Sequence, residues 1–294
     1  MLNPAARPDP RTFALVVLRG VGQIMFQPHA GTGLCFLAGI ALASPMMLAG
    51  AVLGALIGPA TAYLAGFDRA EIEQGLYGFN ATLVGLAVLV FLKPAPPSFG
   101  LLLLGCVAAT FATRLAGAWK IPAYTAPFVL TTWLLLILAH AISGPGIDAA
   151  SPPPSPSPVG FFSAVLRGEA EVMFGATAAT GALFVAGLAL SDPWHAAIAV
   201  LGSIAGTALA AYHGDPSGKI SLGLYGYNAA LAAQALFLRR KSLTTPILAA
   251  LLATVLAESL PSLGLPALTA PFVAAAWIGL AVLRAEGRLF GPWR

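Results

Sequence analysis

The chain has 294 residues, of which 58% are hydrophobic and 9% charged, with a mean hydropathy of +0.85 and a net charge of +4. A soluble domain carries about 25% charged residues, so this composition excludes a soluble surface over most of the chain and indicates a lipid environment. The basic residues lie mostly at the ends of apolar segments and form no patch interleaved with aromatic residues, which excludes a nucleic-acid interface and indicates a role in membrane topology.

Five apolar segments are predicted in the first half, after a polar N-terminal tail that we interpret as cytoplasmic. They cover residues 13–43, 45–64, 75–92, 99–115 and 121–142. Their apolar runs are long and do not alternate with polar residues, which predicts helices rather than the strands of a membrane barrel. Residues 13–43 are too many for one straight span and contain glycine, so we expect this segment to be broken.

A proline-rich linker, residues 143–160, follows the first half and contains no Lys or Arg. The second half repeats the five apolar segments at residues 161–190, 194–211, 223–238, 245–260 and 267–283. Basic residues gather in the two tails and at residues 238–242, which the positive-inside rule places in the cytoplasm, with the linker outside. Each half then crosses the membrane an odd number of times. The chain therefore divides into a first transmembrane repeat (1–142), an external linker (143–160) and a second, inverted repeat (161–294).

Three pairs of motifs indicate an internal duplication. VLRGVGQIMF and VLRGEAEVMF are 148 positions apart, as are GLYGFNATL and GLYGYNAAL; YTAPF and LTAPF are 144 apart. These motifs occupy residues 17–26 and 165–174, 75–83 and 223–231, and 124–128 and 268–272. In an apolar chain, such a duplication predicts two halves that face one another around a site near the middle of the membrane.

These motifs resemble those of the urea transporter family, and the resemblance covers nearly the whole chain. It implies an all-α polytopic membrane protein with ten transmembrane helices, in two inverted five-helix repeats with re-entrant half-helices around a central pore. It also implies a bacterial urea channel: a homotrimer in the lipid of the cell inner membrane, with passive movement of urea through each protomer. We expect both termini to be cytoplasmic and no cofactor to be required.

Urea is flat and uncharged, so a filter for it needs apolar faces and polar edges that replace the water removed from the solute. Phe26 and Phe174 are the candidate faces, and Phe79 and Tyr227 form a second aromatic pair. The resemblance implies that these aromatic residues line the constrictions of the pore. For any single Phe, packing against lipid or protein is the alternative role.

Polar edges are predicted at Gln23 and Glu171, which precede Phe26 and Phe174 by three positions and share a helical face with them. The resemblance implies that both offer oxygen atoms to urea. An interfacial, hydrated position is the alternative for Glu171, and we expect Glu169, on another face of the helix, to be interfacial.

Seven further positions complete the predicted pore. The resemblance implies that the threonines of the TAPF motifs narrow its middle. Two leucines are expected to keep it dry, and two asparagines to cap backbone groups or contact the solute. These positions, together with the neighbour of Glu171, are Thr125, Thr269, Leu83, Leu231, Asn80, Asn228 and Val172. A threonine that bonds back to its own helix is the alternative for the first pair.

Other functions are less consistent with the sequence. An ammonium channel would need paired pore histidines, a coupled carrier several acids within the membrane, and a water channel a repeated Asn-Pro-Ala motif. In this sequence no two histidines are related by the repeat, few acids lie in the apolar segments, and Asn-Pro-Ala occurs once, in the N-terminal tail. Ammonia or ammonium, short-chain amides and water are kept as alternative solutes. Because the sequence shows no nucleophile with a nearby base, no phosphate-binding loop and no metal-binding motif, we predict neither an enzyme nor a metal site. Asp215 is interpreted as a hydrated loop residue.

Overall fold

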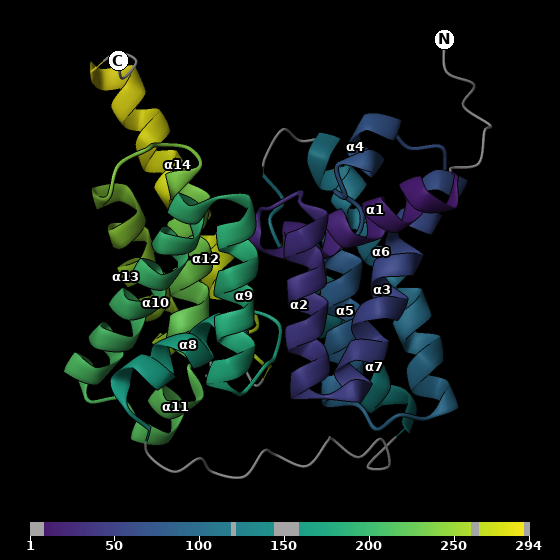
Figure 1. The fold of residues 1–294 in the computed structure, drawn as a ribbon, viewed down its shortest axis with the longest axis horizontal. Coiled ribbons are helices and arrows are strands. Elements are labelled where there is room, and N and C mark those ends of the chain that lie inside the picture. The colour runs from purple at the N-terminus through teal and green to yellow at the C-terminus, as the bar shows by residue number, and fades with distance from the viewer. Residues whose placement is uncertain (1–8, 119–121, 144–158, 260–264, 291–294) are drawn as a thin grey trace. The chain divides into compact units, whose positions relative to one another are not determined.

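A computed structural model describes residues 9–118, 122–143, 159–259 and 265–290 (Figure 1). The described residues form helices and turns without a strand element, which confirms the all-α prediction. Most of the predicted linker, residues 144–158, lies outside the described residues, as does most of the N-terminal tail. Contacts divide the chain into two units. The first comprises Met1–Pro154, Met173–Gly175 and Ala186–Ser191; the second comprises Ser155–Val172, Ala176–Val185 and Asp192–Arg294.

The first unit begins with a broken helix. Helix α1 continues into one turn of 3-10 helix, η1, and the chain resumes as α2 after four residues. The helices of this part are α1 (Pro10–Gly22), η1 (Gln23–Met25), α2 (Ala30–Ala43), α3 (Pro45–Leu64), α4 (Arg69–Glu73), α5 (Phe79–Phe91), α6 (Pro96–Ala118) and α7 (Ala126–Ser143). Side chains of Asp9, Ser44 and Asp68 cap the N-termini of α1, α3 and α4 by accepting backbone N–H bonds, which explains where these helices begin.

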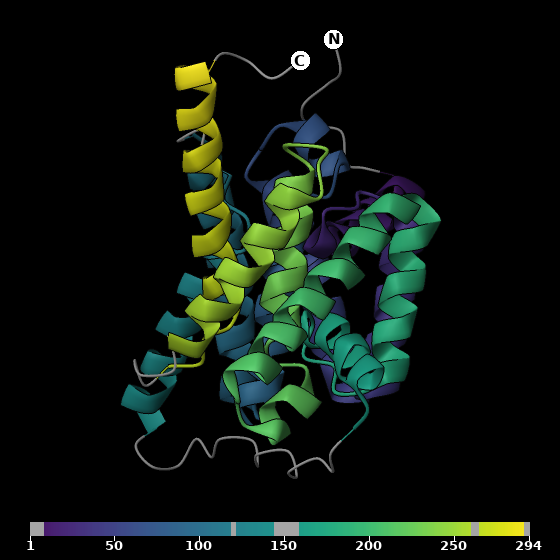
Figure 2. The same cartoon turned by 90° about the vertical axis from the view of Figure 1, so that its left-hand side faces the viewer.

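The second half of the chain repeats this order of elements. A short helix and a break are followed by two apolar helices, a helix of six residues and three more helices. They are α8 (Phe161–Glu171), α9 (Ala178–Ser191), α10 (Pro193–His213), α11 (Ser217–Leu222), α12 (Gly226–Phe237), α13 (Thr244–Ser259) and α14 (Ala270–Phe290). In two views, the last turns of α14 extend beyond the neighbouring helices of the second unit (Figures 1 and 2).

Four helices of the described residues are long and apolar enough to cross a membrane, namely α3, α6, α10 and α14. The pair formed by Pro10–Met25 and Ala30–Ala43 is a fifth candidate and is bent by 75°. This bend confirms the break expected within residues 13–43. Shorter apolar helices are α5, α7, α9 and α13.

Helices α5 and α12 are at the centre of their units. Ten of the thirteen residues of α5 and eleven of the twelve of α12 are buried. Close packing requires small residues, as at Gly54 of α3, where a Cβ atom would lie 2.2 Å from the carbonyl oxygen of Ala81 on α5. The central helices therefore provide a rigid support for the motifs at their N-terminal ends.

Candidate functional site

In each unit, the glycine of the VLRG motif packs directly on the GLYG turn. Gly75 has a φ of +81°, and a Cβ atom there would lie 2.4 Å from the backbone nitrogen of Gly20. Gly223 has a φ of +82°, and a Cβ atom there would lie 2.3 Å from the nitrogen of Gly168. Any other residue would have to adopt an unfavourable left-handed conformation, and its Cβ atom would clash with the neighbouring backbone. Only glycine therefore fits these positions.

An arginine adjacent to each of these contacts ties the same two segments together. Arg19 donates a hydrogen bond of 2.9 Å to the carbonyl oxygen of Glu73, and Arg167 donates one of 3.0 Å to that of Ser221. Both arginines and both acceptors are related by the repeat. The arginines therefore have a structural role, because they connect α1 and α8 to the residues that precede the GLYG turns.

Strained backbone occurs at residues of the paired motifs. Within the described residues, four non-glycine residues have a positive φ: Phe26 (65°), Phe174 (60°), Tyr124 (47°) and Leu268 (48°). They form two repeat-related pairs. A large side chain adopts this left-handed conformation only where surrounding contacts enforce it, and such strain gathers at functional sites.

Phe26 and Phe174 both lie against the YTAPF motif of the first unit. The Phe26 ring is 6.0 Å from that of Tyr124, edge to face. Phe174, which clusters with the first unit, has its ring 6.4 Å from that of Phe128 and 5.8 Å from that of Phe91. Both candidate faces are half-buried. Each of the two rings thus contacts an aromatic residue at the N-terminal end of α7, although they are far apart in the sequence.

Asn80, on α5, holds this end of α7 in place. Its Nδ2 donates to the carbonyl oxygen of Tyr124 at 3.2 Å and to Thr113 at 3.0 Å, and its Oδ1 accepts the N–H of Phe128 at 3.2 Å. The side chain is buried and both ends of its amide are engaged. Of the two roles left open, capping of backbone groups is the one these bonds support.

Asn228, on α12, makes the same connection to α14. Its Nδ2 donates to the carbonyl oxygen of Leu268 at 3.2 Å, and its Oδ1 accepts the N–H of Phe272 at 3.0 Å. The hydroxyl group of Tyr227 donates a second bond to Leu268, at 2.7 Å. Phe79, the counterpart of Tyr227, has no hydroxyl and cannot make the equivalent bond to Tyr124.

Gln23 and Glu171 are no longer equivalent in their contacts. The Gln23 amide donates a bond of 3.0 Å to the carbonyl oxygen of Gln74, which leaves its Oε1 to accept. Glu171 has no amide nitrogen with which to donate the corresponding bond. It ends α8 and is partly buried. Both groups thus lie where α1 and α8 end, and both carry oxygen atoms that can accept hydrogen bonds.

The remaining predicted pore residues are interior. Thr125 and Thr269 are each 3% exposed and immediately precede α7 and α14. Leu83, Leu231 and Val172 are no more than 2% exposed. Leu83 and Leu231 are related by the repeat, as are Thr125 and Thr269.

Glu169 is not interfacial, contrary to the sequence prediction. Its side chain is 0% exposed, and neither carboxylate oxygen has a hydrogen-bond partner among the described residues. Its counterpart in the first repeat is Val21, which is also fully buried. The prediction was wrong because α8 turns this face toward the protein interior.

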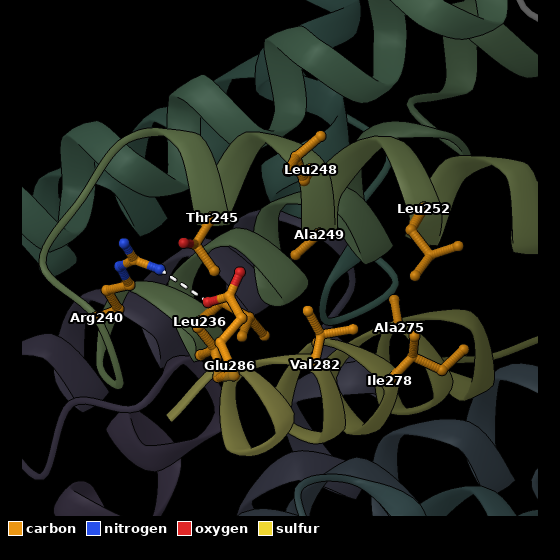
Figure 3. Close-up of a pocket in the computed structure, with 12 residues that line it drawn as sticks. Leu236, Arg240, Thr245, Leu248, Ala249, Leu252, Ala275, Ile278, Val282 and Glu286 are labelled. Carbon is orange, nitrogen blue, oxygen red and sulfur yellow. Dashed lines mark hydrogen bonds and ion pairs between the residues drawn. The ribbon is translucent and has the colours of Figure 1, made fainter. Parts of the chain in front are cut away.

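A groove of about 180 Å³ lies in the second unit, among α12, α13 and α14 (Figure 3). Arg240 and Glu286 point toward one another across it and form an ion pair of 3.1 Å, while aliphatic residues such as Leu252 and Ile278 line the other end. None of the predicted pore residues lines this groove. It is therefore separate from the motifs described above.

Comparison with known proteins gives the family. The family model described as "Urea transporter" matches residues 14–284, which include every predicted pore residue. The chain belongs to the urea transporter family. This confirms the resemblance read from the three pairs of motifs. Members of the family are polytopic membrane transporters and not enzymes.

Individual relatives are also named as urea transporters. The chain is 29% identical to urea transporter 1 of Rattus norvegicus over 240 residues, which cover 74% of this chain and 60% of the rat protein. It is 27% identical to urea transporter 1 of Ovis aries over 299 residues, which cover 90% of this chain and 76% of the sheep protein. The matched region of the rat protein is thus well short of its full length.

Proposed function

We propose that this protein moves urea passively across a membrane, through a slot in which Phe26 and Phe174 contact the faces of the solute. The observation that carries the proposal is the placement of these two rings. Both belong to strained, left-handed residues and both lie against the YTAPF motif. Membership of the urea transporter family and the names of the relatives support urea as the solute.

The chemistry of urea accounts for this arrangement. The molecule is planar, with one acceptor and four N–H donors, so rings can cover its faces while oxygen atoms at its edge accept the N–H groups. The Gln23 Oε1 atom and the Glu171 carboxylate have this acceptor character. Each bond to protein replaces one to water, which would otherwise cost on the order of a few kcal/mol per unpaired group. Thr125 and Thr269 complete the polar lining in this proposal, while Leu83, Leu231 and Val172 exclude water from the centre.

We propose that the transport is passive, since a neutral solute brings no charge for a channel to compensate. A coupled carrier would depend on a membrane acid that binds and releases a cation. Glu169 and Glu171, the two acids of α8, would be the candidates for that role. Urea flux is therefore expected to stay the same when a proton or sodium gradient is imposed on vesicles. Flux that followed either gradient would favour a carrier.

The decisive experiment measures urea flux in proteoliposomes by stopped-flow light scattering. We expect Glu171→Ala to lower the flux at least tenfold, because an acceptor at the edge of the slot is lost. Glu73→Ala is the matched control, since this exposed residue contributes its backbone oxygen to Arg19 and keeps that bond. Unchanged flux in Glu171→Ala would remove the proposed role of this carboxylate.

Topology and assembly complete the proposal. In the second unit, the Arg240–Glu286 ion pair joins residues 238–242 to the C-terminal end of α14, and Val159 donates to the Ser221 hydroxyl near α11. This supports placing the basic loop and the C-terminus in the cytoplasm and the linker outside. The same charge distribution is the support for inverted repeats. The homotrimer and the cell inner membrane rest on the family resemblance.

A further inference from the structure

Three side chains that can bind a metal ion meet at one end of the second unit. His213 is the last residue of α10, Asp215 follows in the next turn, and Glu258 is next to last in α13. One ligand atom from each lies within 4.8 Å of the other two. The Nδ1 atom of His213 is 3.0 Å and 3.1 Å from the two carboxylate oxygens of Glu258.

Asp215 is oriented by its surroundings. Gly214 adopts a left-handed conformation with a φ of 77°, and the N–H of Asp215 donates to the carbonyl oxygen of Ala210 at 3.0 Å. The Tyr225 hydroxyl donates to Oδ1 of Asp215, also at 3.0 Å. The Oδ2 atom is shielded from solvent and has no hydrogen-bond partner among the described residues. A buried carboxylate oxygen without a donor is costly, which points to a cationic partner.

The first unit places a different pair of charged side chains beside the corresponding tyrosine. There the hydroxyl of Tyr77, the counterpart of Tyr225, donates to Glu71, and Arg114 lies 3.5 Å from the same carboxylate. Arg114 and Glu258 are 144 positions apart, the offset that also relates the TAPF motifs and the back-bonded threonines of α6 and α13. The first repeat therefore supplies its own cation.

In the second repeat the arginine is replaced by a second carboxylate. Within the described part of the chain, no Lys or Arg forms an ion pair with Asp215 or Glu258, and the side chain next to the Glu258 carboxylate is that of His213. Two carboxylates and an imidazole thus converge where the other repeat has one carboxylate and a guanidinium. Asp215 is accordingly not the simple hydrated loop residue expected from the sequence.

We propose that His213, Asp215 and Glu258 bind a divalent cation of the zinc class. Two ligand atoms on a tetrahedral zinc ion lie roughly 3.3 Å apart, close to the 3.0 Å separation of His213 and Glu258. The ion takes the place of the proton shared by these groups. Imidazole nitrogen selects zinc over magnesium or calcium, which prefer sites made of oxygen alone. Tyr225 orients Asp215 as an outer-shell donor.

The position allows a cation to enter from solution and leaves room for water as a further ligand. The side chain of His213 is 37% exposed and that of Glu258 is 20% exposed. Figure 1 shows α11, which follows this turn, at the end of the second unit opposite the C-terminal end of α14. A bound ion joins the C-terminal ends of α10 and α13 and stabilises the turn that leads to α12.

Zinc binding to the purified full chain, with no histidine tag, provides the test. We expect one Zn²⁺ per chain by calorimetry or equilibrium dialysis, a rise in Tm with Zn²⁺, and no comparable effect of Mg²⁺. Glu258→Arg copies the arrangement of the first repeat, so it should keep a folded, monodisperse protein while it lowers zinc affinity at least a hundredfold. Tyr225→Phe should lower the affinity about tenfold, as loss of outer-shell donors does.

His140→Ala is the control, because His140 is an exposed histidine of α7 in the first unit. It should leave zinc stoichiometry and affinity unchanged. Zinc bound equally well by the wild type and by Glu258→Arg, or Mg²⁺ bound as tightly as Zn²⁺, would overturn the proposal. So would a rise in Tm that disappears in His140→Ala and persists in His213→Ala. None of these measurements depends on urea flux.

Discussion

The side-chain oxygen of Asn228 accepts the backbone N–H of Phe272 at 3.0 Å, across 44 positions of sequence. This bond and the one from its amide nitrogen to Leu268 fix the start of α14 and a left-handed residue at once. The first unit repeats the arrangement with Asn80. One side chain on a buried helix thus holds each TAPF motif in its strained shape.

Replacement of this asparagine should therefore destabilise the protein and reduce transport together. We expect Asn228→Ala to lower the free energy of unfolding by about 2–4 kcal/mol, because two buried hydrogen bonds are lost and their backbone partners stay buried. Thermal unfolding and vesicle flux measure the two effects. Arg239→Ala, at an exposed position of the basic loop, is the comparison and should change neither. A fully active, stable Asn228→Ala protein would contradict the clamp.

Gly75 and Gly66 offer a comparison that separates two causes of strain. Both have a positive φ, but a Cβ atom at Gly66 meets nothing within 4 Å, whereas one at Gly75 meets the backbone of Gly20. Gly66→Ala should cost about 1 kcal/mol for the left-handed backbone alone. Gly75→Ala should in addition separate α1 from the GLYG turn and abolish folded protein. Equal thermal stability of the two variants would show that the clash is relieved without cost.

The width of the slot should depend on Phe174. Removing this ring with Phe174→Ala takes away a face of the slot and the contacts with Phe91 and Phe128. We expect a lower flux of urea and a higher ratio of methylated urea to urea in stopped-flow measurements. Phe162→Ala is the control, since Phe162 is 76% exposed and lies outside the predicted slot. A selectivity ratio equal to that of the wild type would place Phe174 outside the path of the solute.

Glu169 should be replaceable with a gain in stability. Its carboxyl group is buried without a hydrogen-bond partner among the described residues, whereas Val21 occupies the same repeat position. Glu169→Leu removes the desolvation cost at similar volume, and we expect the free energy of unfolding to rise by about 1–3 kcal/mol. Urea flux should persist if Glu169 has no part in transport. A loss of flux in the stabilised variant would instead assign this acid a role in the pathway.

Several features of the fold are predictable from local sequence. The break near Phe26 follows from a segment too long for one span, and the repeated order of helices follows from the paired motifs. The first GLYG turn lies between two helices. It is preceded by α4, of five residues, and α5 begins directly after it at Phe79.

Other features depend on tertiary contacts that no local pattern contains. The left-handed φ of Phe26 and Phe174 is invisible in the sequence, because neither glycine nor asparagine marks it and surrounding packing enforces it. The burial of Glu169 depends on which face of α8 meets the interior. His213 and Glu258 are 45 positions apart and meet because α10 packs against α13. A list of pore candidates can be read from the motifs, but the partners of their polar atoms cannot.

Positive φ angles recur at matching positions of the two repeats, at Phe26 and Phe174 and at Tyr124 and Leu268. This recurrence indicates when the turns arose. The same unfavourable backbone shape at matching places in two copies is most simply inherited from one gene that existed before the copies were joined. The exchange of glutamine for glutamate at 23 and 171, and of arginine for glutamate at 114 and 258, then belongs to later divergence. Ancestral architecture set the shape of these turns, and subsequent substitution of charged groups gave the two repeats different side-chain chemistry.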